Sequence, residues 1–146
     1  MTWPLLPARR PFFITGVFTM DAAKIFLTVV GIIYLGFAVW CTAKPVETAA
    51  ALGLKLDPGS GQSEYVTVYG GFQLALAILF LWPWLDASVL SCSLFTCLVI
   101  HGCLVLMRTV GFFLFTGIRP MTMGFAASEW VVFLIAGTLW WWKRAL

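Results

Sequence analysis

The chain has 146 residues, of which 62% are hydrophobic and only 10% are charged, and its net charge is +3. A water-soluble domain of this length exposes too large a share of its surface to hide so many apolar side chains, so the composition excludes a soluble globular protein. The basic residues are scattered along the chain, which argues against a nucleic-acid partner. The apolar runs are continuous rather than alternating, which favours membrane-spanning helices.

Residues 1–21 are predicted to form an N-terminal arm in the headgroup region of the membrane. The prolines in its first half prevent a regular helix there. The apolar stretch that begins at Phe12 is expected to lie along the membrane surface, with Arg9 and Arg10 near anionic lipid.

Four apolar segments follow the arm, each close to the roughly 20 residues that cross a hydrocarbon core about 30 Å thick. We predict transmembrane helices at about residues 22–43, 63–82, 87–108 and 124–142. A short surface helix over Val46–Leu54 joins the first two, and the conformation of residues 109–123 is left open. The predicted fold is all-α: an integral membrane four-helix bundle over residues 22–146, preceded by the interfacial arm.

Glycines within these segments predict close contacts between helices, because a residue without a side chain lets two backbones approach each other. The predicted helix-packing positions are Gly31, Gly36, Gly70 and Gly71.

The distribution of basic residues predicts the orientation, because loops rich in lysine and arginine tend to remain in the cytoplasm. The side of the two termini carries Arg9, Arg10, Lys24, Lys143 and Arg144. The opposite side carries Lys44, Lys55, Arg108 and Arg119, together with acidic residues. We therefore predict a multi-pass membrane protein with both termini in the cytoplasm.

Polar side chains gather in the outer half of the predicted bundle, which is the half opposite the termini. They are Glu64, Tyr69 and Gln73 in the second span, His101 and Arg108 in the third, and Glu129 in the fourth. Tyr65, Tyr69 and Gln73 are four residues apart, so they line one helix face. A charge as deep as Glu129 needs a partner inside the bundle, and Arg108 can bind it through two hydrogen bonds.

Two interpretations of this cluster are open. Arg108 and Glu129 can form a structural ion pair that holds the third helix to the fourth. Alternatively, because Glu64 competes for Arg108, two acids share one arginine, and a bound cation or polar ligand completes the set.

A copper or redox site is a third hypothesis, since Cys97 and His101 are four residues apart and Cys103 and Met107 follow in the sequence. These residues project at different angles, and buried cysteines and methionines are most often apolar filler. No metal site is therefore predicted.

A series of motifs resembles the small bacterial four-helix membrane proteins catalogued as domain of unknown function 4345, which look akin to the DoxX-like proteins. The motifs are Lys44-Pro45, Ala-Ala-Leu-Gly-Leu at 50–54, Glu64-x4-Tyr69-Gly70-Gly71, Arg108 and Glu129. The likeness covers about residues 24–145. It implies the four-helix architecture and the bacterial inner (cytoplasmic) membrane, and it implies no particular activity.

The sequence favours a protein without catalytic activity, because its serines lack a neighbouring His–Asp pair and it has no glycine-rich phosphate loop. The first hypothesis is an accessory or assembly subunit, with the lipid bilayer and other membrane-protein subunits as partners. The second is a binder or carrier of a small polar or quinone-like ligand at the polar cluster. No cofactor is predicted; a lipid or a quinone is the ligand considered.

Overall fold

The computed structural model describes the backbone of residues 12–145 and the side chains of residues 22–144, so residues 1–11 of the predicted arm lie outside it. Within the described residues every regular element is a helix. The longer elements are α1 (Phe12–Ala43), α2 (Pro45–Leu52), α3 (Ser60–Tyr65), a π-helical segment (Val66–Gly71), α4 (Phe72–Leu81), α5 (Leu90–Leu114) and α6 (Pro120–Ala145). Short 3-10 turns, Trp82–Trp84 and Ala87–Val89, connect α4 to α5.

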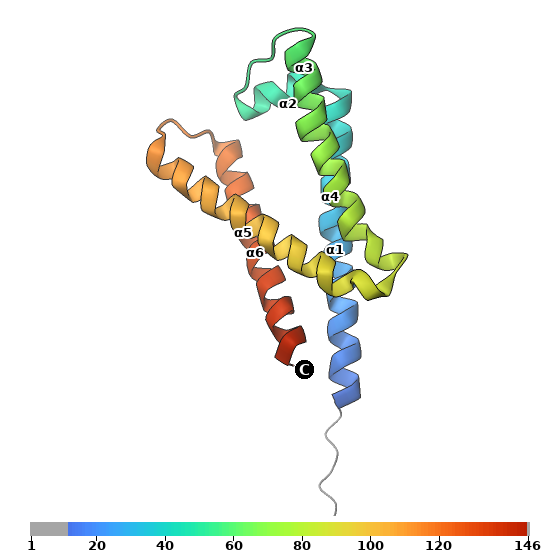
Figure 1. Ribbon diagram of the computed structural model, residues 1–146. Coiled ribbons are helices and arrows are strands. Elements are labelled where there is room, and N and C mark those ends of the chain that lie inside the picture. The colour runs from blue at the N-terminus through green and yellow to red at the C-terminus, as the bar shows by residue number, and fades with distance from the viewer. Residues whose placement is uncertain (1–11, 146) are drawn as a thin grey trace, which may run out of the picture.

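Four helical segments are long and apolar enough to cross a membrane, as the sequence predicted. They are residues 22–43, 60–84, 87–114 and 120–144. The segments run alternately in opposite directions, so α1 begins and α6 ends at the same end of the molecule (Figure 1). We call this end the terminal end and the other the α2 end. The all-α fold class is confirmed.

The helices are longer than predicted. α1 begins at Phe12 rather than near residue 22, because no proline interrupts the chain between Phe12 and Ala43. The part of the predicted arm from Phe12 to Asp21 is therefore helical and continuous with the first span. The open question about residues 109–123 is also answered: α5 continues to Leu114, and α6 begins at Pro120, where a helix favours proline in its first turn.

The α2 end has a short cap over the bundle. α2 begins at Pro45 and ends at Leu52; the next residue, Gly53, caps it with a φ of 85°, in the left-handed region that favours glycine. Arg119, in the α5–α6 connection, donates a hydrogen bond from Nη1 to the carbonyl oxygen of Ala50 at 2.9 Å. This bond attaches the cap to the hairpin that α5 and α6 form.

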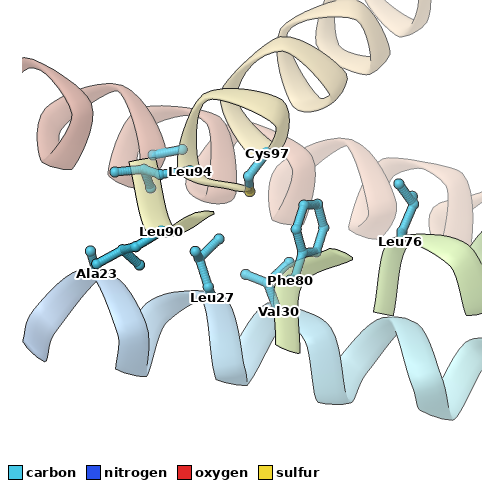
Figure 2. Packing of buried hydrophobic residues seen from close by; sticks show 9 residues of the cluster. Ala23, Leu27, Val30, Leu76, Phe80, Leu90, Leu94 and Cys97 are labelled. Atoms are coloured by element: carbon cyan, nitrogen blue, oxygen red, sulfur yellow. The ribbon is translucent and has the colours of Figure 1, made fainter. Parts of the chain in front are cut away.

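A buried apolar cluster closes the bundle toward the terminal end (Figure 2). Leu27, Phe80 and Leu94 are fully buried and come from α1, α4 and α5, and α6 contributes Ala136. In lipid, helices associate through close packing rather than through the hydrophobic effect. This cluster therefore provides packing contacts among all four spans.

The four predicted packing glycines have two different surroundings. A Cβ atom added to Gly31 would lie 2.8 Å from Cγ of Leu81, and one added to Gly70 would lie 2.5 Å from Oγ1 of Thr42. Both glycines therefore mark close approaches between the first span and the second. A Cβ atom at Gly36 or Gly71 meets nothing within 4 Å, because these residues lie on faces that no other described element covers.

The terminal end carries paired aromatic and basic side chains. Trp84 donates its indole N–H to Thr28 Oγ1 at 2.6 Å, and Lys24 Nζ lies 5.5 Å from the centre of the Trp84 ring. Lys143 Nζ donates to Ser91 Oγ at 2.6 Å. Such tryptophans and lysines are typical of a membrane–water boundary.

In the turn between the second and third spans, the side-chain hydrogen bond with Ser88 lowers the pKa of Asp86 below its usual range.

Candidate functional site

The spans form two helical hairpins, one of α1 and α4 and the other of α5 and α6. A cavity of about 400 Å³ lies between these hairpins. α5 and α6 diverge from α1 and α4 toward the α2 end (Figure 1), and all these elements, together with α2, contribute to the cavity wall. Most of the wall is apolar or aromatic. The aromatic residues are Tyr34, Phe37, Trp40, Tyr65, Tyr69 and Phe125.

The ion pair expected from the sequence lines this cavity. Arg108 Nε donates to Glu129 Oε2 and Arg108 Nη2 donates to Glu129 Oε1, both at 2.5 Å. Their side chains are 28% and 13% exposed. Glu129 lies nine residues after the first residue of α6, Pro120, which is about 13 Å along the helix axis at 1.5 Å per residue. The carboxylate is therefore deeper in the bundle than the shorter predicted helix implied, and it has the partner that such depth requires.

Glu64 does not join this pair. It is exposed in α3 and contributes nothing to the cavity wall, whereas its neighbour Tyr65 is buried. The predicted excess of negative charge is thus absent from the site, because one arginine meets one carboxylate there. Consecutive residues of a helix are rotated by about 100° from each other, so Tyr65 and Glu64 cannot face the same way.

His101 takes part in a hydrogen-bonded chain that links α1 to α5. Its Nδ1 lies 2.8 Å from the carbonyl oxygen of Cys97, which can only accept a hydrogen bond, so Nδ1 carries the proton. Nε2 is then the acceptor for the hydroxyl of Tyr34, at 3.1 Å. Both ring nitrogens of this buried histidine are therefore engaged within the protein.

The sulfur-containing residues of α5 do not form a set of metal ligands around His101. Cys97 Sγ is 3.6 Å from His101 Nδ1, but Cys103 and Met107 are exposed on other faces of α5. Among the described residues, no group of three or more His, Cys, Asp or Glu side chains lies close enough together to hold a metal ion.

The second span places Tyr65, Tyr69 and Gln73 in the cavity wall, as their spacing predicted. The rings of Tyr65 and Tyr69 are stacked, with centroids 4.6 Å apart and an interplanar angle of 19°. The hydroxyl of Tyr65 lies 3.7 Å from Cys41 Sγ. Directly after Tyr65 the helix widens into the π-helical segment Val66–Gly71, which contains Tyr69; such a distortion is frequent at functional sites.

Gln73 has an unusual environment. Its Oε1 atom is buried and has no hydrogen-bond partner; among the described residues it is the one buried side-chain nitrogen or oxygen in this condition. Buried polar atoms are nearly always hydrogen-bonded in proteins.

Sequence reasoning missed Tyr34, although it lies at the centre of the site. The available signal was the spacing of Tyr34, Phe37 and Trp40, which places aromatic side chains three residues apart on one side of α1. Thr48 in α2 and Ser128 in α6 also line the cavity. They were missed because a hydroxyl is uncharged and neither residue belongs to a recognisable motif.

The fold and this site define the class: a membrane protein with four helical spans and a cavity between its two hairpins. The family model for a "Domain of unknown function (DUF4345)" matches residues 22–142, and the chain belongs to that family. Searches of curated proteins and of solved structures found no match.

Proposed function

We propose that this protein binds or carries a small ligand inside the membrane, and that the ligand occupies the cavity between the hairpins. One observation carries the proposal: a space of about 400 Å³ lined mostly by apolar and aromatic groups, with a few polar groups pointing into it. Ligand sites of proteins have this composition and volumes of about 300–1,000 Å³. A molecule with an apolar body and a small polar head, such as a quinone-like compound, matches these walls.

The cavity also distinguishes this proposal from a purely structural ion pair. Protein interiors are close-packed and leave few voids larger than a water molecule. α5 and α6 already pack against each other as a hairpin, so holding them together requires no empty space beside Arg108 and Glu129. A bound ligand explains both the pair and the cavity.

Binding without turnover is supported by how the reactive side chains are used. Ser128 Oγ donates to the carbonyl oxygen of Phe125 at 2.8 Å rather than to a base. His101 engages both of its ring nitrogens, with Tyr34 and Cys97. Among the described residues of the cavity wall, no nucleophile is paired with a free general base, which nucleophilic catalysis requires.

Native mass spectrometry of the gently extracted protein tests the proposal. We expect an additional small mass on the wild type and its loss from Ser128→Phe, which places a ring in the cavity. Thr138→Phe is the matched control: it is on the same helix, its hydroxyl also donates to a carbonyl of its own helix, and it does not line the cavity. A wild type without any additional mass, or a Ser128→Phe variant that retains it, contradicts the proposal.

A second candidate function, an accessory subunit of a larger membrane complex, is favoured by the last residues of α5 and the first residue after it. Phe113, Leu114 and Phe115 are 86%, 68% and 65% exposed, so three consecutive apolar side chains lack packing within the chain. An interface with another membrane protein would cover them. Co-purification of a partner that Phe113→Ser weakens would support this role, and a wild type that runs alone after gentle extraction would argue against it.

For localisation we propose the inner membrane of a bacterium, with the terminal end in the cytoplasm. Lys24, Lys143 and Arg144 lie at the terminal end, whereas Lys44 at the other end is 3.0 Å from Glu47 and Arg108 is paired with Glu129. The positive-inside rule counts lysines and arginines, and with Arg9 and Arg10 the sequence has five on the side of the termini against Lys44, Lys55, Arg108 and Arg119 on the other, which favours a cytoplasmic terminal end. Labelling of single cysteines from either side of the membrane tests this orientation.

A further inference from the structure

The cavity is only partly enclosed, and the contacts around it show which sides are closed. Toward the α2 end, α2 covers it with Thr48 and Leu52. Between the first and fourth spans, the rings of Phe37 and Phe125 meet edge to face, with centroids 5.7 Å apart. Toward the terminal end, the apolar cluster around Phe80 fills the space between the helices. The side that remains is the one between the second span and the third.

On this side the two spans separate. They are in contact nearer the terminal end, where Ser93 Oγ donates to the carbonyl oxygen of Leu79 at 3.0 Å and the ring centroids of Phe80 and His101 are 6.5 Å apart. From there α5 diverges from α4 toward the α2 end (Figure 1). Among the described residues, no hydrogen bond or ring contact joins the second span to the third beyond Phe80 and His101. Beside the cavity, these two spans are therefore not held together.

Two side chains mark the rim of this opening, because they line the cavity and are also exposed. Tyr69 of the second span and Leu104 of the third are each 36% exposed. Leu104 follows Ser93 by eleven residues, which is about three helical turns, so it lies on the side of α5 that faces α4. The other side of α5 faces α6, since a Cβ atom added to Gly102 would lie 3.2 Å from the ring of Phe133. The cavity thus opens beside Tyr69 and Leu104.

The depth of this rim decides which molecules can enter. Leu104 is ten residues before Leu114, the last residue of α5, and Tyr69 is nine residues after Ser60, the first residue of α3. At about 1.5 Å per residue these separations are about 15 Å and 13 Å, each close to half of a hydrocarbon core about 30 Å thick. The rim therefore faces lipid chains rather than water.

We infer that the ligand is a long-chain, lipid-soluble molecule that enters sideways from the bilayer: its head lies in the cavity, and its chain passes between the second and third spans, over Tyr69 and Leu104, into the lipid. The inference rests on the proposed function, since it assigns the ligand class of the same cavity. A space of about 400 Å³ suits a ring or another compact head. The chain needs no further space in the protein, because lipid tails are as apolar as the side chains of the helices.

The first test identifies the molecule that the full chain acquires in its own membrane, without an added probe. The occupant of the cavity is the mass that the wild type and Thr138→Phe carry and that Ser128→Phe lacks, whereas lipids that adhere to the outer surface remain on all three. Fragmentation of this mass in the spectrometer shows whether it contains a chain. We expect an alkyl or isoprenoid chain attached to a compact head.

A bulky side chain at the rim tests the path of the chain. Leu104→Trp places an indole in the opening, and we expect the occupancy of the cavity to fall about tenfold, the size of effect that overpacking of one side chain typically has. Leu106→Trp is the matched control: it is on the same helix, 61% exposed and outside the cavity wall, so it should retain the occupancy. Leu104→Phe repeats the test with a smaller enlargement, and unfolding in mixed detergent–SDS micelles verifies that each variant folds.

The other outcomes separate the inference from the proposed function. If the occupant has no chain, or if Leu104→Trp and Leu104→Phe retain it at the wild-type level, the inference is overturned while the cavity remains a ligand site. If Leu106→Trp loses it equally, the loss is not specific to the opening, and the inference is again overturned. If no mass distinguishes the wild type from Ser128→Phe, both the proposed function and the inference are wrong.

Discussion

The two ends of the same four spans are built from different kinds of side chain. Toward the terminal end, fully buried apolar residues such as Leu27, Phe80 and Leu94 fill the space between the helices. Toward the α2 end, the same helices carry tyrosines, a tryptophan and an ion pair around a cavity of about 400 Å³. One end is closed by packing, and the other is kept apart by large aromatic and paired polar groups.

This difference indicates a division of labour along the bundle axis. Lipid tails are as apolar as the side chains that helices bury, so a membrane bundle is stabilised mainly by van der Waals contact. The closed end provides this contact for all four spans. The α2 end can then retain a cavity and a pair of buried charges without separating the hairpins.

The ion pair offers the strongest test of how the α2 end is stabilised. Glu129→Leu leaves Arg108 charged and unpaired within the membrane span, and we expect it to lower the free energy of unfolding by about 3–5 kcal/mol. The double variant Arg108→Met/Glu129→Leu removes both charges and should recover most of this loss. Unfolding in mixed detergent–SDS micelles measures both values. A single variant no less stable than the double variant would contradict this account of the pair.

Phenylalanines at the two ends allow a direct comparison of packing. Phe80→Ala empties a fully buried position in the closed end, and the resulting void should cost about 3 kcal/mol. Phe125→Ala enlarges an existing cavity and removes one edge-to-face contact, with Phe37 at 5.7 Å, so it should cost less than about 1.5 kcal/mol. The same unfolding assay compares them. Equal losses would mean that the cavity wall is as tightly packed as the closed end.

Adjacent glycines in the π-helical segment test the contact between the first two spans. Gly70→Ala places a Cβ atom 2.5 Å from Thr42 Oγ1, and we expect a loss of about 1–2 kcal/mol. Gly71→Ala meets nothing within 4 Å and should be neutral or stabilising by up to about 1 kcal/mol, because alanine favours the helix. In a Thr42→Ala background the cost of Gly70→Ala should diminish. If it persists there, the clash with Thr42 is not its cause.

Much of this architecture could be predicted from the sequence, because a membrane span is encoded by the length and apolarity of a single continuous segment. The number of spans and their alternation follow from such local patterns, and the alternation in turn places Arg108 and Glu129 at the same depth of the bundle. The extension of α1 to Phe12 was predictable in principle, because no proline interrupts this stretch. However, an apolar segment that lies along the membrane surface and one that continues a spanning helix can have the same composition.

The remaining features depend on how each helix is rotated about its axis, which composition does not specify. The sequence places Glu64 in the polar cluster and leaves Tyr34 out, because the polar residues of the first span were not considered with those of the other three. In the structure Glu64 is exposed beside the buried Tyr65, whereas Tyr34 contacts His101 across the bundle. The π-helical segment has no periodicity that predicts it, and the unpaired Gln73 is recognised only once its surroundings are known.

The smallest expected effect concerns the cap over the α2 end, where Arg119 joins the two hairpins through one hydrogen bond to Ala50. The Ala50 carbonyl also accepts from the backbone N–H of Gly53 at 3.0 Å, so the guanidinium adds a second donor there and complements the dipole at the carboxyl end of α2. Because Arg119 is exposed to solvent, Arg119→Ala should lower global stability by less than about 1 kcal/mol. Its effect should instead be local, as faster amide hydrogen exchange across Pro45–Leu52. Lys55→Ala, an exposed lysine at the same end, is the control. Equal exchange in both variants would mean that α2 is held by the buried side chains of Thr48 and Ala49 alone, and that the cap does not depend on the far hairpin.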